Sequence, residues 1–263
     1  MTLVGSSQAN DIVQSAILSR HPYMLSRYGN TEFKCLFTDS EFPALANNAG
    51  FFPADPGLLP EFRKTYLEAS GWIDDLCPWN YEMYFRRKRE WVRRLSNIQH
   101  FLPLPVLNPG QPWIHALSGM NVLIVHPFKQ TIESQYPIML QHGLLPSFRS
   151  LMVFRAVQTI AGNRDPRFNN WFEALAWMQE EIARLDFDVA LIGAGAYGLP
   201  LAAHIKSTGR QAIHIGGGLQ LFFGVLGKRW ERSELIGLHN HWVRPLPQDT
   251  PQECGLVESG CYW

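Results

Sequence analysis

The sequence predicts a single α/β domain with a Rossmann-like, mostly parallel sheet and helices on both faces. Two observations predict this fold: a strand, glycine turn, helix and strand follow one another over residues 188–215, and other short apolar runs end in polar or glycine turns. The chain has 263 residues and is 46% hydrophobic, so it can bury one large core without disulfides or a structural metal. We therefore expect one domain over residues 1–263.

The unit in the last third of the chain is the best defined. We expect a buried strand at Asp188–Ile192, a glycine turn at Gly193–Gly198, a helix at Leu199–Ser207 and a second strand at Gln211–Ile215. A unit of this length suits the right-handed crossover that joins two parallel strands. It therefore predicts a parallel sheet with a turn at the carboxyl end of each strand.

Other apolar runs complete the predicted sheet and its helices. Asn121–Val125 is a short apolar run of the kind that is buried on both faces of a parallel sheet. Further strands are expected at Tyr23–Leu25, the first of the chain, and at Ser150–Phe154. Helices are expected at Ile12–Leu18 after an Asn10 or Asp11 cap, and at Pro60–Ser70, Tyr81–Leu95, Thr131–Gln141 and Phe168–Leu185.

Two parts of the chain fit this pattern less well. Residues 47–115, rich in Pro, Trp and charge, are expected to form a peripheral helical or irregular insertion, and residues 245–263 an irregular C-terminal tail.

Composition excludes several classes of function. Lys and Arg number 23, as do Asp and Glu, so a protein that mainly neutralises nucleic-acid or membrane phosphates is not expected. The four cysteines form no C-x-x-C pair, which argues against a zinc ribbon or redox motif. Neither a signal peptide nor a transmembrane segment is recognisable, and we expect a cytoplasmic protein that binds a small ligand.

The glycine turn after the strand at Asp188–Ile192 is a candidate phosphate site. Gly193, Gly195 and Gly198 satisfy G-x-G-x-x-G, with Tyr197 inside the motif, between a strand and a helix. Free backbone N–H groups and the helix dipole favour a phosphate at such a position. A dinucleotide site also needs an acidic residue about 20 positions on, and the next strand has none. The glycines alternatively only permit close packing of helix on sheet.

Arg27-Tyr28-Gly29-Asn30-Thr31-Glu32 follows the strand at Tyr23–Leu25. Gly29 permits a turn, and Asn30 or Thr31 is expected to cap the next helix. Arg27 suits a diphosphate, and the oxygens of Asn30 and Glu32 suit its divalent cation. The alternative is an ordinary capped helix start with a surface ion pair.

A second glycine turn lies at Gly216, Gly217 and Gly218, followed by Lys228 and Arg229. The two cations are candidates to neutralise a pyrophosphate leaving group, or else they end a solvated helix.

His126 follows the strand at Asn121–Val125. It is a candidate base or hydrogen-bond donor, with a structural histidine as the alternative. His239 and His241 have metal-like spacing, but no further ligand lies nearby and we expect no metal there.

Motifs of serine hydrolases, zincins and P-loop enzymes are missing. If the strands are parallel, all the turns named above meet at one rim, where open α/β sheets bind ligands.

The segment Arg27–Glu32 resembles the R-[FY]-G-D-G-E segment of GT-D fold glycosyltransferases, a bacterial family first catalogued as a domain of unknown function. Residues 187–198 resemble that family's late strand, glycine turn and helix, and residues 211–216 its following strand and turn.

The resemblance implies a Rossmann-like domain that transfers a hexose from a UDP-sugar to a glycan, lipid-linked or protein acceptor, as in polysaccharide biosynthesis. It puts Glu32 at a manganese- or magnesium-type cation, Arg27 near the donor phosphates, and the turns at Gly193 and Gly216 beside the nucleotide. Asn30 stands where the family has Asp, so weaker metal binding is expected.

Two other functions stay open at this point. The glycine motif alone allows an NAD(P)-dependent oxidoreductase, and Asn30 allows a non-catalytic member of the fold that binds a nucleotide sugar or a protein.

Overall fold

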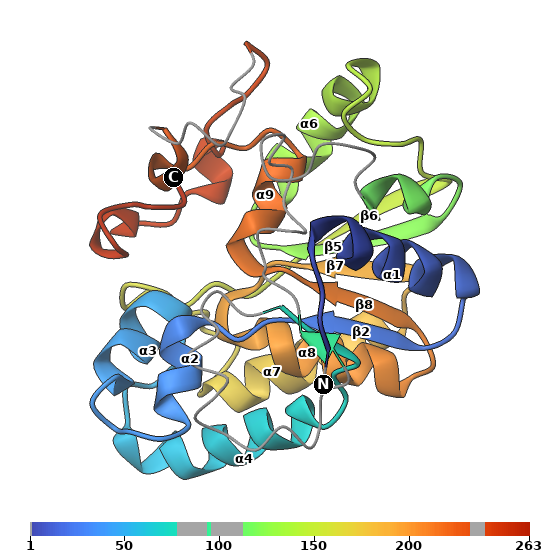
Figure 1. Ribbon diagram of the computed structural model, residues 1–263. Helices are drawn as coiled ribbons and strands as arrows, with labels where there is room; N and C mark the ends of the chain where they lie inside the picture. Colours follow the sequence, from blue (N-terminus) through green and yellow to red (C-terminus); the bar gives the residue numbers. More distant parts are fainter. Residues whose placement is uncertain (1, 78–93, 96–112, 232–239) are drawn as a thin grey trace.

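The computed structural model describes residues 2–77, 94–95, 113–231 and 240–263 (Figure 1). All strand pairs among them are parallel, in the order β1-β4-β3-β2-β8-β7-β5-β6. The predicted Rossmann-like α/β class is confirmed. The strands are β1 (Thr2–Leu3), β2 (Tyr23–Ser26), β3 (Asp75–Leu76), β4 (Arg94–Leu95), β5 (Asn121–His126), β6 (Ser150–Arg155), β7 (Val189–Ile192) and β8 (Gln211–His214).

The sheet separates two hydrophobic cores, and side chains alternate between them along each strand. On β2, Met24 points into one core, whereas Tyr23 and Leu25 point into the other. Helices cover both faces, as predicted (Figure 1). One face carries α2 (Asn30–Cys35), α3 (Phe42–Ala49), α4 (Leu59–Ser70), α7 (Trp171–Ala183) and α8 (Gly198–Ser207), and the other carries α1 (Ser6–Ser19), α6 (Lys129–Gln141) and α9 (Leu219–Phe222).

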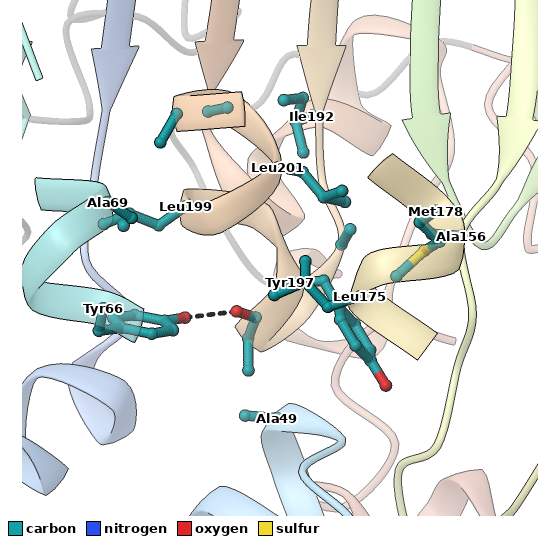
Figure 2. Close-up of a cluster of buried hydrophobic side chains, with 14 of the residues drawn as sticks. Ala49, Tyr66, Ala69, Ala156, Leu175, Met178, Ile192, Tyr197, Leu199 and Leu201 are labelled. Atoms are coloured by element: carbon teal, nitrogen blue, oxygen red, sulfur yellow. Dashed lines mark hydrogen bonds between the residues drawn. The ribbon is translucent and has the colours of Figure 1, made fainter. Parts of the chain in front are cut away.

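Side chains of the core that packs against β7 and β8 also contact the glycine turn and hold it in place (Figure 2). Tyr66 of α4 donates a 2.6 Å hydrogen bond to the carbonyl of Ala196. Trp171, at the start of α7, stacks on Tyr197 with 5.1 Å between ring centroids and 14° between planes. Residues 59–70 lie within the stretch that was expected to be peripheral. They nevertheless contribute to the core that contains Met24.

Several sequence-based details are corrected. Gly5, not Asn10 or Asp11, is the N-cap of α1, and the Asn10 side chain instead accepts a 2.9 Å hydrogen bond from the backbone N–H of Trp113. The strand predicted to be first is the second, because Thr2–Leu3 pairs with Arg94–Leu95.

The remaining corrections concern α2 and the insertion. Gly29 is the N-cap of α2 and no side chain caps the helix, so the prediction of Asn30 or Thr31 as the cap was wrong. The helix predicted at Tyr81–Leu95 lies outside the described residues except for Arg94–Leu95, which form β4.

No helix among the described residues is long and apolar enough to cross a membrane.

The N-terminus of α7 offers a direct test of local stability. The side-chain oxygen of Asn170 accepts a 2.9 Å hydrogen bond from the N–H of Glu173. Asn170→Ala leaves that N–H without a partner, and we expect it to lower the free energy of unfolding by about 1 kcal/mol in urea titrations. Asn170→Asp keeps the acceptor and should retain nearly all of the stability. Equal losses in the two variants would contradict the assignment.

Candidate active site at the carboxyl edge of the sheet

A cavity of about 480 Å³ opens at the carboxyl ends of the central strands. Its walls come from the segments that follow β2, β5, β6 and β7, from α3, and from the C-terminal tail. The predicted site residues that line it are Arg27, Gly29, Asn30, Glu32, His126, Gly193, Gly195, Tyr197, Gly217 and Arg229. The structure therefore brings the two predicted loops to one cavity.

Three predicted site residues do not line the cavity. The Lys228 ammonium donates to the carbonyl of Ser259 at 3.2 Å, away from the cavity wall. Gly198 and Gly216 matter because a side chain at either position would collide with a neighbouring residue. A Cβ on Gly198 would overlap the His214 ring, and a Cβ on Gly216 would overlap the Arg27 guanidinium.

The Arg27 guanidinium connects the first loop to the second. It lies directly over Gly216, whose φ of +61° also favours glycine. Arg27 follows β2 and Gly216 follows β8, and these strands are neighbours in the sheet. The pairing of the strands thus sets a positive charge beside the glycine turn, where a phosphate would be stabilised.

Glu32 is buried, with its side chain folded back over the N-cap of α2. It is 6% exposed, and a Cβ on Gly29 would overlap its carboxyl group. Burial raises the pKa of Glu32, the Arg27 guanidinium opposes the rise, and the nearby Glu258 adds to it. Gly29 is therefore needed to make room for this carboxyl group.

The predicted cation site is a poor match to these side chains. Asn30 is exposed at the first position of α2, whereas Glu32 is buried beside the Arg27 guanidinium. Within the described ranges, no group of three His, Cys, Asp or Glu residues is placed to hold a metal ion. One buried carboxyl group and one exposed neutral amide offer a single charged oxygen ligand group, which is a poor match to a resident divalent cation.

His126 ends β5, and its imidazole is fixed by the backbone. It is 2% exposed, and its Nδ1 accepts a 3.0 Å hydrogen bond from the N–H of Phe128. Burial lowers the pKa of His126 to about 3, so the ring is neutral at physiological pH. Since Nδ1 is an acceptor, the proton resides on Nε2. This geometry suits His126 to donate a hydrogen bond from Nε2 and does not suit it to act as a base.

This state of His126 predicts a pH effect on stability. Because its pKa is about 3 in the folded protein and ordinarily 6.5 for a histidine, the unfolded chain binds more protons between these limits. Acidification from about pH 7 to about pH 5 should therefore cost about 2 kcal/mol at this residue. We expect His126→Gln to flatten the pH dependence of the free energy of unfolding by that amount. An NMR titration that gives His126 a pKa near the ordinary value for histidine would contradict the assignment.

The glycine motif adopts a compact turn against neighbouring backbone. A Cβ on Gly193 would lie 2.7 Å from the carbonyl oxygen of Gly216, and one on Gly195 would lie 2.9 Å from that of Ala49. The 3-10 turn Gly195–Tyr197 leads directly into α8. Gly193, Ala194 and Gly195 line the cavity just before this helix start, a position where a phosphate would be favoured.

The sequence analysis missed the contribution of the C-terminal tail. Glu258, Tyr262 and Trp263 line the same cavity as the predicted loops, together with Trp230. The tail is held by Asp249, which is 2% exposed and accepts hydrogen bonds from the N–H and hydroxyl of Thr131, both at 2.7 Å. No motif signals this wall, because it depends on a contact between residues far apart in the sequence.

Only one histidine of the pair near the C-terminus can be placed. His239 lies outside the described residues, and the His241 ring stacks on His142 with 4.3 Å between centroids.

The fold and the cavity together define an α/β protein with a candidate ligand site at the carboxyl edge of a parallel sheet. No protein-family model matches the chain, and no curated protein matches it by sequence. In structure it is similar to a glycosyltransferase (DUF1792) from Streptococcus sanguinis, with a TM-score of 0.52, 13% identity and 84% of each chain covered. This likeness shows a shared fold and confirms the predicted GT-D-like architecture.

Proposed function

We propose that the protein is a glycosyltransferase that moves a hexosyl group from a UDP-sugar to an acceptor hydroxyl. One observation carries the proposal: the guanidinium groups of Arg27 and Arg229 and the glycine turn at Gly193 line one cavity. Its volume of about 480 Å³ is within the range of small-molecule sites. The fold shared with a glycosyltransferase supports the choice of reaction.

The proposed reaction requires the leaving diphosphate to be stabilised. Charge builds on the diphosphate as the bond to the sugar breaks, and preorganised cations and N–H groups stabilise it most where water is excluded. Arg27, Arg229 and the N–H groups of Ala194 and Gly195 in the glycine turn would supply this stabilisation. The neutral His126 would donate a hydrogen bond from Nε2 to the donor. This arrangement needs no resident metal, although a cation carried in with the nucleotide would add to it.

Calorimetry with UDP-glucose, UDP-galactose and UDP, each with and without Mn²⁺, tests the proposal. We expect UDP to bind without Mn²⁺ and to compete with the sugar nucleotides for one site. Failure of every nucleotide to bind under both conditions would reject the proposal. A large gain with Mn²⁺ that disappears in Glu32→Gln would instead restore the cation site predicted from the sequence.

The other functions have less support. For an oxidoreductase, a carboxylate should follow β8, but β8 ends at His214, which is buried against Gly198. A non-catalytic role follows if Asn30 has replaced a needed aspartate. Turnover that is present only in Asn30→Asp, and not in the parent chain, would favour that role.

A further inference from the structure

The C-terminal wall brings a second carboxyl group to the cavity. Glu258 lines the cavity together with Glu32, and the two are close enough for the charge of one to raise the pKa of the other. Unlike Glu32, the Glu258 side chain is open to solvent, with 47% of its surface exposed. Glu258 is therefore accessible to an acceptor molecule that enters the cavity from solvent.

Other titratable groups of the cavity are poorly suited to take a proton. His126 is neutral with Nδ1 occupied, because its pKa is held at about 3. Glu32 is 6% exposed and folded over Gly29, away from bulk solvent. A general base must reach the proton that it removes, so geometry favours the exposed carboxylate over the buried groups.

The contacts of Glu258 orient its carboxylate. Oε2 accepts a hydrogen bond from Nη2 of Arg229 and lies 3.4 Å from the thiol of Cys261. Oε1 makes no hydrogen bond in the described part of the chain. The guanidinium thus holds one oxygen and leaves the other available for a proton.

The backbone around Glu258 adopts conformations that are unfavourable for residues other than glycine. Glu258 and Ser259 both have left-handed conformations, with φ of 45° and 59°, although neither is glycine. Such conformations persist where the surrounding structure holds them and occur often at functional sites. Here two backbone hydrogen bonds hold the segment that follows. The N–H of Arg229 donates to the carbonyl of Cys261 at 3.1 Å, and the N–H of Lys228 donates to the carbonyl of Trp263 at 3.0 Å.

We propose that Oε1 of Glu258 is the general base of the reaction, an inference that depends on the proposed glycosyltransferase function. Glu258 takes the proton of the acceptor hydroxyl while the acceptor oxygen forms a bond to the anomeric carbon of the donor. The bond from that carbon to the diphosphate oxygen breaks, and UDP leaves with the electron pair. Arg229 contacts the base and also lines the cavity. The same guanidinium would therefore orient Glu258 and stabilise the leaving diphosphate.

The test combines binding and turnover in Glu258→Gln. We expect UDP to bind within about threefold of the parent affinity, or more tightly, because a negative charge beside the phosphates is removed. Release of UDP from UDP-glucose or UDP-galactose, with water or added sugars as acceptors, should fall about 100-fold or more. In Glu258→Ala, added formate should restore part of the turnover, since it can occupy the vacated carboxylate position.

Glu253→Gln is the matched control, because Glu253 is an exposed glutamate of the same tail with a φ of 56° and does not line the cavity. It should keep parental binding and turnover. Turnover of Glu258→Gln within about threefold of the parent, or a parallel loss of binding and turnover without formate rescue, would overturn the assignment. A parent chain that binds UDP without turnover would also overturn it, while one that binds no nucleotide would reject the proposed function itself.

Discussion

Gly193→Ala is expected to destabilise the protein by about 3 kcal/mol and to abolish nucleotide binding. The new Cβ would lie 2.7 Å from the carbonyl oxygen of Gly216 and 2.7 Å from Cδ2 of His126. Neither neighbour can move freely, because one is backbone beside β8 and the other is a 2% exposed ring. The two glycine turns must therefore separate, and the phosphate position between them is lost. Urea unfolding and UDP calorimetry measure the two effects.

Gly255→Ala provides the control for this substitution. A Cβ at Gly255 meets nothing within 4 Å, so we expect stability and binding to stay near parental values. If Gly193→Ala folded with parental stability and bound UDP normally, the close approach of the two turns would not be required.

Arg27→Gln is expected to raise the Kd for UDP about 100-fold, a loss of about 2.7 kcal/mol of binding free energy. The guanidinium lines the cavity directly over Gly216, so its removal takes a charged donor from the diphosphate position. The substitution has a second effect, because Arg27 lowers the pKa of Glu32 against the effect of burial. Without Arg27, the Glu32 carboxyl group should keep its proton to higher pH.

Lys228→Gln tests whether the effect of Arg27 comes from its position or from net charge alone. The Lys228 ammonium contacts the carbonyl of Ser259 and does not line the cavity. We therefore expect a change in Kd of less than about threefold at moderate salt, where distant charges are screened. Similar losses in the two variants would show that the cavity attracts nucleotides only through overall charge.

Much of the fold was predictable because it depends on local patterns. The buried strand at Asn121–Val125 and the strand, turn and helix from Asp188 to Ser207 have hydrophobic patterns that a parallel sheet requires. The boundaries of α1 and α2 were less predictable. Gly5 and Gly29 cap these helices through backbone geometry, so the polar residues nearby, Asn10 and Asn30, gave a misleading signal.

Most of the predicted residues that line the cavity lie at strand ends. Arg27 and Gly193 both follow strands, and the parallel order of β2, β8 and β7 brings them to one edge. The sequence left His126 as a base, a hydrogen-bond donor or a structural residue, because the choice depends on burial and on the N–H of Phe128. The wall formed by Glu258 and Tyr262 depends on long-range packing of the tail, which has no periodic pattern.

A crystal structure of the protein with bound UDP tests the central claim most directly. We expect the diphosphate in the cavity, within hydrogen-bond distance of the Arg27 guanidinium and the backbone N–H groups of the turn at Gly193. A nucleotide bound elsewhere on the molecule, or one whose phosphates contact neither Arg27 nor this turn, would contradict the account.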